Sequence, residues 1–156
     1  MSSADDRLAA LGLALPQVAA PVAAYQPAVR TGRYVYTAGQ LPMAGGKLLA
    51  TGKVGAEISA GEAARLAGTC ALNALAAVAS VSGGLQAIRR IVKVTGFVAS
   101  SPGFTGQAQV MNGASELLLD VLGEAGRHAR SAVGVAVLPL DAPVEVELIA
   151  EVRDEE

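Results

Sequence analysis

The stretch from Ser59 to about Val81 is rich in alanine and apolar over most of its length. It opens with Ser59-Ala-Gly-Glu62, the capping-box spacing of a hydroxyl and a carboxylate, and Gly83-Gly84 follows its end. This pattern predicts one long helix. Its most apolar part, Ala71 to Val81, is short for a bilayer span and is interrupted by Asn73, so we expect the helix to be buried in a protein core.

Strand and helix patterns alternate on both sides of this helix. Alternating or β-branched residues predict a strand pair around a turn at Thr31-Gly32 and three later strands, and a second apolar stripe predicts another long helix. The predicted strands are Val29–Thr37, Ile88–Val98, Ser131–Leu138 and Val144–Val152; the other predicted helices are Asp5–Leu13, ended by Pro16 and Pro21, and Gln107–Leu122.

The predicted elements follow one another as a strand pair, a helix, a strand, a second helix and two strands. This order predicts the fold class. Two long helices pack most economically on one face of a single sheet, so we expect an α+β protein. The 156 residues suit one domain, which we place at 22–154 after an N-terminal extension with a short helix at 1–21. The open sheet face would carry much apolar surface, so we expect an oligomer that covers it.

Charge and targeting signals narrow the expected partners. The formal net charge is −2 and no basic stripe is present, which argues against nucleic acid. The nearest basic cluster, Arg89, Arg90 and Lys93, is interpreted as a solvated strand edge. The acidic N-terminus does not have the pattern of a secretory signal, and a single cysteine favours a reducing compartment, so we expect a cytoplasmic protein with no membrane partner.

Several common kinds of site are not expected. One histidine and one cysteine cannot form a metal site alone, and no phosphate-binding or dinucleotide-binding glycine motif occurs, so we expect neither a metal nor an organic cofactor. Cys70 lies in the apolar run of the long helix and is interpreted as a buried, inert thiol. His128 lies in a Gly-Arg-His-Ala loop and is interpreted as a surface residue.

Arg130 is the most informative single residue. It precedes seven nearly unbroken small or apolar residues, so its guanidinium must find an anionic partner or solvent. Residue type alone favours an ordinary salt bridge at the end of a strand. The alternative is the recognition of a ligand carboxylate, which the planar fork of donors can bind with two hydrogen bonds.

Other polar residues carry two interpretations each. Glu145 and Glu147 share one strand face, where solvent exposure is the simplest reading, but one of them could pair with Arg130 or hold a water molecule. Tyr25 is either a packing ring or a phenol at the mouth of a pocket. Asn112 lies on the second long helix and could simply bond locally.

Two separated motifs resemble the Rid family of reactive intermediate deaminases, also called YjgF or endoribonuclease L-PSP. The first is Tyr25-Gln-Pro-Ala-Val-Arg-Thr-Gly-Arg-Tyr-Val-Tyr-Thr-Ala-Gly-Gln-Leu-Pro42. The second is Arg130-Ser-Ala-Val-Gly-Val-Ala-Val-Leu-Pro139, followed by Val144-Glu-Val-Glu-Leu-Ile-Ala150. The resemblance covers nearly the whole chain, from about Val22 to Val152, and looks like a longer branch of the family.

The resemblance implies a chorismate-mutase-like fold and a homotrimer whose sheets form a central barrel. Ligand pockets would lie in the clefts between subunits. The family's carboxylate-binding arginine falls on Arg130, its pocket tyrosine on Tyr25, its strand-end glycine on Gly39, its asparagine on Asn112 and its acid on Glu145.

The implied reaction is hydrolysis of a 2-imino or enamino acid to a 2-keto acid and ammonia. Arg130 would fix the carboxylate and Glu145 would orient a water molecule. The family's characteristic cysteine is replaced by Ala132, and an acidic residue often found two positions later is replaced by Gly134. The resemblance therefore excludes thiol chemistry at this position and implies an enlarged pocket.

Two other functions are compatible with the same residues. The chain could be a trimer that binds or senses small carboxylates such as 2-keto acids without turnover. It could also be an endoribonuclease, as the older family name suggests, although the acidic net charge counts against this function.

Overall fold

The computed structural model describes residues 1–18 and 23–155 and confirms the α+β class. The helices are α1 (Ala4–Ala10), α2 (Ala60–Ser82) and α3 (Gln107–Leu122), with short 3-10 turns η1 (Leu85–Ala87), η2 (Gly123–Gly126) and η3 (Pro139–Asp141). The strands are β1 (Ala28–Thr31), β2 (Tyr34–Thr37), β3 (Met43–Ala44), β4 (Lys47–Leu48), β5 (Ile88–Ala99), β6 (Ala129–Val135) and β7 (Val144–Val152).

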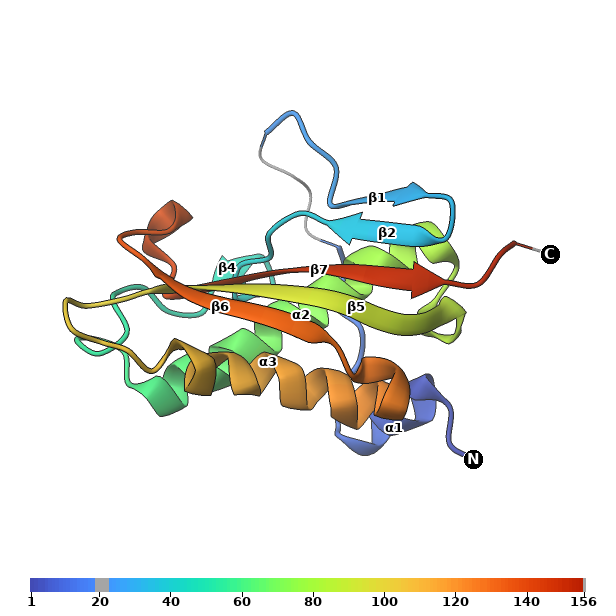
Figure 1. Ribbon diagram of the computed structural model, residues 1–156, viewed down its shortest axis with the longest axis horizontal. Helices are drawn as coiled ribbons and strands as arrows, with labels where there is room; N and C mark the ends of the chain where they lie inside the picture. The colour runs from blue at the N-terminus through green and yellow to red at the C-terminus, as the bar shows by residue number, and fades with distance from the viewer. Residues whose placement is uncertain (19–22, 156) are drawn as a thin grey trace.

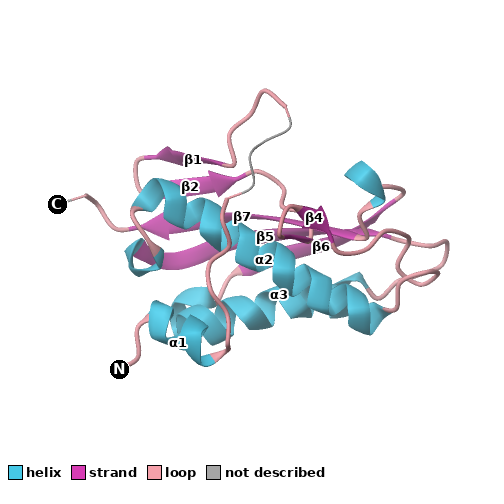
Figure 2. Cartoon of the chain, turned by 180° about the vertical axis from the view of Figure 1, so that it is seen from behind, coloured by secondary structure: helices cyan, strands magenta, loops and turns pink. Residues whose placement is uncertain are grey.

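The main sheet has five strands in the order β1-β2-β7-β5-β6. Only β5 and β6 run parallel, since α3 connects them, and the other neighbours are antiparallel. The long helices cover one face, so α2 lies behind the sheet in Figure 1 and in front of it in Figure 2. The opposite face, which we call the open face, has no helix over it among the described residues.

The two long helices form as the sequence predicts. The Ser59 side chain accepts a hydrogen bond from the Glu62 N–H at the start of α2, and Gly83 ends the helix in the left-handed conformation. α2 is long and apolar enough to cross a membrane, but its buried side, which includes Leu66 and Leu75, packs in the protein core. The core helix of a folded domain meets the same length and composition criteria.

One strand prediction needs correction. The strand predicted at 131–138 covers Ala129–Val135, because its partner β5 ends at Ala99, opposite Val135. The connection between β2 and α2 contains the small β3–β4 hairpin, whose turn residues Gly45 and Gly46 have φ of 59° and 77°.

The predicted division of the chain at residue 21 remains a prediction. Pro21 and Val22 lie outside the described residues. Within the described part, α1 packs against α3 and buries Leu8, so the N-terminal helix contributes to the same core as the rest of the chain.

The sequence predicted a solvated strand edge for the basic cluster, and this holds for Arg89 and Arg90: β6 begins opposite Lys93, so these two arginines are exposed on a part of β5 that pairs only with β7. β5 lies between β7 and β6, and its register with β7 shifts between Ile88 and Arg90 and again between Ile91 and Lys93. Each shift is a bulge that places one extra residue on β5. Arg89 and Arg90 are consequently both exposed, although they are consecutive in the strand.

Candidate functional site

Arg130 lies on β6, and its side chain turns toward α3. Nη1 donates to Asn112 Oδ1 (2.9 Å) and Ser115 Oγ (3.1 Å), and Nη2 donates to the Ala108 carbonyl (3.2 Å). Asn112 and Ser115 are three residues apart, which puts them on one helix face. Asn112 thus does more than bond locally, and α3 fixes the orientation of the guanidinium.

All three acceptors around Arg130 are neutral. Within residues 1–18 and 23–155, no carboxylate lies within 4 Å of Arg130, so the strand-end salt bridge that residue type alone favoured is not formed. A guanidinium has five N–H donors, and three are used here. The remaining donors, on Nε and Nη2, are adjacent and can bind both oxygens of one carboxylate.

His128 belongs to this site and is not the isolated surface residue that its loop suggested. Its ring is half-buried, with Nδ1 2.6 Å from the Gly126 carbonyl and Nε2 2.8 Å from Ser115 Oγ. The carbonyl can only accept, so Nδ1 carries a proton, and in the neutral ring Ser115 donates its hydroxyl hydrogen to Nε2. The Ser115 oxygen is then free to accept from Arg130.

A depression of about 300 Å³ lies beside the guanidinium. Its walls come from α3, the η2–β6 connection and the first residues of β6. It is lined by Asn112, Ser115, Leu119, Arg127, His128 and Arg130. Sequence reasoning missed Ser115 and His128, although the spacing of Ser115 from Asn112 was a usable signal.

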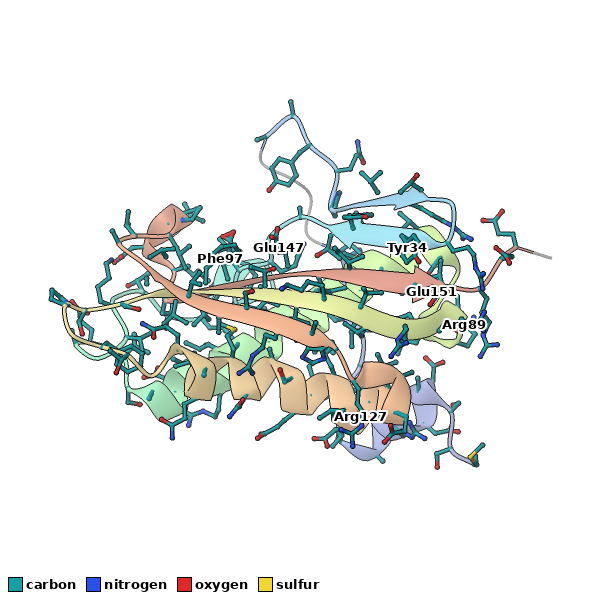
Figure 3. The ribbon with its side chains drawn as sticks, in the orientation of Figure 1. Tyr34, Arg89, Phe97, Arg127, Glu147 and Glu151 are labelled. Atoms are coloured by element: carbon teal, nitrogen blue, oxygen red, sulfur yellow. The ribbon has the colours of Figure 1, made fainter. Side chains whose placement is uncertain are left out.

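Glu145 lies on the other side of the sheet. Along β7 the even-numbered residues are buried under the helices, and the odd-numbered residues Glu145 and Glu147 face the open side, as predicted. Figure 3 labels Glu147 and Phe97 on this face. Arg130 pairs in register with the buried Val94 and therefore points to the helix side. A single chain does not bring Glu145 and Arg130 together.

Gly39 lies directly beside Glu145. A Cβ at Gly39 would collide with the Glu145 carboxylate, so the absence of a side chain at this position makes room for the acid. Burial, followed by the negative charge of Glu147, raises the pKa of Glu145 above its ordinary value. Such a carboxylate is better suited to accept a proton near neutral pH than an exposed glutamate.

We expect Glu145→Gln to raise the melting temperature at pH 7 by roughly 1–2 °C. The pKa of Glu145 is higher in the folded protein than in the unfolded chain, so protonation of this carboxyl stabilises the folded wild type at a pH below the unfolded pKa. This stabilisation is lost as the pH rises through the folded pKa. The difference between the two proteins should therefore vanish below about pH 4. Thermal unfolding of both proteins from pH 3.5 to 8 measures this effect, and a pH-independent difference would contradict it.

The remaining predicted residues lie in two places. Ala132 and Gly134 follow Arg130 on the same face of β6; Ala132 packs against the core, and Gly134 lies close to the side chains of Gln107 and Ser100. Tyr25 is exposed in the loop before β1 and forms no hydrogen bond with Arg130. The predicted residues thus form one group around Arg130 and a second around Gly39 and Glu145.

Other chemistry finds little support within the described residues. No group of three histidine, cysteine, aspartate or glutamate side chains there could hold a metal ion. Cys70 is fully buried, and burial raises the pKa of its thiol well above the ordinary value, which confirms it as an inert core residue.

The fold defines a class of small α+β proteins in which two long helices cover one face of a mixed sheet. The family model described as "YjgF/chorismate_mutase-like, putative endoribonuclease" matches residues 5–152, and the chain belongs to this family. The resemblance found in the sequence is thereby confirmed.

Individual relatives agree with this assignment. Protein TCP17 of Trypanosoma cruzi is 44% identical, with 92% of this chain and 91% of that protein covered. The Agrobacterium tumefaciens protein Atu1372, whose function is described as unknown, is 47% identical with a TM-score of 0.90, covering 96% of this chain and 92% of that one. Escherichia coli TdcF with bound serine is 27% identical with a TM-score of 0.62, covering 90% and 94%.

Proposed function

We propose that the protein hydrolyses 2-imino acids to 2-keto acids and ammonia. The observation that carries this proposal is Arg130, a guanidinium held in place by neutral acceptors and left with two free, adjacent donors. Such a group is preorganised for a carboxylate, which every 2-imino acid carries next to its imine carbon. Water would add to the imine carbon, the carbon–nitrogen bond would break, and the nitrogen would leave as ammonia.

We further propose that the site is completed between copies of the chain in a homotrimer. Arg130 and Glu145 lie on opposite sides of the sheet, so the acid of the reaction must come from a second copy. The open face supports this arrangement because it exposes large apolar side chains, including Val29, Tyr34, Tyr36, Val92 and Val133. Edge strand β6 of one copy would then carry Arg130 to the Glu145 of the next.

The direct test is a coupled assay. An amino-acid oxidase would generate 2-imino acids from several amino acids in the presence of semicarbazide, which traps the imine that remains. The proposal predicts that added protein lowers the amount trapped and speeds formation of the keto acid. No effect with any of these imines would mean that the protein is not an imine hydrolase.

The second candidate is a trimer that binds carboxylates without turnover. The crystal structure of TdcF, a more distant relative, has bound serine, and this observation supports a binding function. This alternative predicts that 2-oxobutanoate raises the melting temperature of the protein, that Arg130→Ala abolishes the rise, and that no imine is consumed. An incubation with RNA would test the endoribonuclease named in the family description.

We expect Ser115→Ala to raise the Kd for 2-oxobutanoate roughly tenfold, because one hydrogen bond to a charged group is worth roughly 1.5 kcal/mol. Ser115 acts through Arg130, so Ser115→Thr, which keeps a hydroxyl, should restore part of the affinity. Calorimetric titration measures the effect. Equal affinities of wild type and Ser115→Ala would show that the hydroxyl does not position Arg130.

A further inference from the structure

A second group of arginines gathers around the start of β5, at the end of the sheet and beyond the first residue of β6. Arg89 and Arg90 lie at the start of β5, where the bulge turns two consecutive side chains outward. Arg33, from the turn between β1 and β2, lines the same hollow. A regular strand would point Arg89 and Arg90 to opposite faces of the sheet, so the irregular backbone is what brings their charges together.

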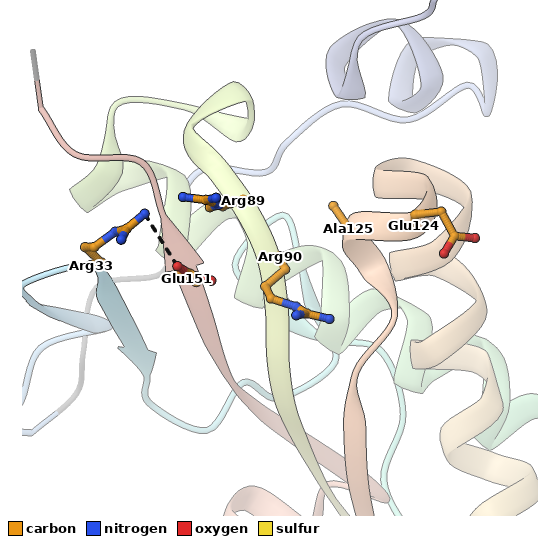
Figure 4. A pocket seen from close by; sticks show the side chains of 6 residues that line it. All are labelled: Arg33, Arg89, Arg90, Glu124, Ala125 and Glu151. Atoms are coloured by element: carbon orange, nitrogen blue, oxygen red, sulfur yellow. Dashed lines mark ion pairs between the residues drawn. The ribbon is translucent and has the colours of Figure 1, made fainter.

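The hollow has a volume of about 470 Å³ and is lined by Arg33, Arg89, Arg90, Glu124, Ala125 and Glu151. Figure 4 shows the ion pair between Arg33 and Glu151, with Arg89 beside them, while Arg90 extends from β5 toward the segment of η2 that carries Ala125. A second hollow of about 490 Å³ shares Arg90 and Glu151 with the first, and it reaches Arg127 and His128, which also line the depression beside Arg130. There is room for a small molecule that contacts two or more of these guanidinium groups.

The positive charges in the hollow are only partly neutralised. Arg33 approaches Glu151 at 3.7 Å and Asp154 at 3.6 Å, and its buried Nε has no hydrogen-bond partner among the described residues. Within the same residues, Arg89 and Arg90 have no carboxylate within 4 Å.

The local charge has the opposite sign to that of the whole chain. Three arginines and two glutamates line the first hollow, whereas the formal net charge of the chain is −2. Like charges brought together repel one another unless an anion lies between them. The arrangement is therefore stabilised when a multiply charged anion is bound.

We propose that this hollow binds a small anion with at least two negative charges, such as a phosphate ester, a pyrophosphate group or a polycarboxylate. Guanidinium groups bind phosphate and carboxylate oxygens through paired hydrogen bonds, and three of them from two chain segments can hold an anion from several sides. The site differs from the proposed imine site, because the first hollow has no lining residue in common with the depression beside Arg130.

The test is calorimetric titration of the full chain with pyrophosphate and, separately, with citrate, which tells phosphate recognition from carboxylate recognition. We expect Arg89→Ser and Arg90→Ser each to raise the Kd of the preferred anion about tenfold or more. Arg65→Ser, which removes an exposed arginine on α2, is the matched control and should change the Kd less than twofold. Excess 2-oxobutanoate should leave the binding unaltered.

Several results would overturn the proposal. Absence of binding of both anions at millimolar concentration would do so, as would an equal loss of affinity in Arg65→Ser, since that loss would indicate a general charge effect. Displacement by 2-oxobutanoate would place the anion at Arg130 instead. If neither anion binds and Arg90→Ser changes the oligomer size in light scattering, the arginines serve contacts between copies.

Discussion

Replacing Arg130 by alanine is expected to lower kcat/KM for imine hydrolysis by about 100-fold or more, because the carboxylate loses a two-point, charge-assisted contact worth roughly 3 kcal/mol. The three neutral acceptors around Arg130 lie at a partly exposed site and can bond to water, so the fold should persist. The coupled imine assay measures the activity, and thermal unfolding confirms that the variant is folded.

Two further variants make this result specific. Arg130→Lys keeps the charge but cannot reproduce the planar fork, so we expect an intermediate loss. Arg65→Ala, on the exposed side of α2, removes the same residue type elsewhere and should retain wild-type activity. Wild-type activity in Arg130→Ala would remove the basis of the proposed function, even if the protein hydrolyses imines.

Replacing Val133 by aspartate is expected to break the proposed trimer and abolish activity together. Val133 lies on the open face of edge strand β6 opposite Phe97, and its side chain is 44% exposed in the single chain. If a second copy covers this face, the variant must bury a charge there, which costs several kcal/mol. Light scattering should show monomers, with activity lowered at least 100-fold at micromolar concentration because the cleft is incomplete.

The control for this experiment is Leu11→Asp. Leu11 is also an exposed apolar residue, but it follows α1 on the helix-covered side of the molecule. This variant should keep both the oligomer and the activity. A trimeric, active Val133→Asp would show that the open face of β6 is not the contact surface.

The local elements could be predicted because their signals are local. The apolar stripe at 107–122 defined α3 to the residue, and Ser59 and Gly83 defined the ends of α2, since caps depend on a few adjacent residues. The alternation of apolar and acidic residues along β7 also placed Glu145 and Glu147 on one face of the sheet. The family resemblance then joined these elements into the correct fold.

The arrangement of the site depends on contacts between distant segments, and these were less predictable. The alternation of residues along β7 does not determine whether Glu145 shares a sheet face with Arg130. That relation depends on how β5 pairs with β7 and, after the crossover through α3, with β6. The role of His128 required the approach of Ser115 from α3. The bulge at Arg89 depends on the register with β7, and the sequence of β5 alone carries no clear sign of it.

A crystal structure of the protein with bound 2-oxobutanoate is the most direct test of the account. We expect its carboxylate to accept hydrogen bonds from Arg130 Nε and Nη2, with Glu145 of a neighbouring copy facing the keto carbon. A ligand bound away from Arg130, or one held by residues of a single chain with Glu145 remote from it, would contradict the account.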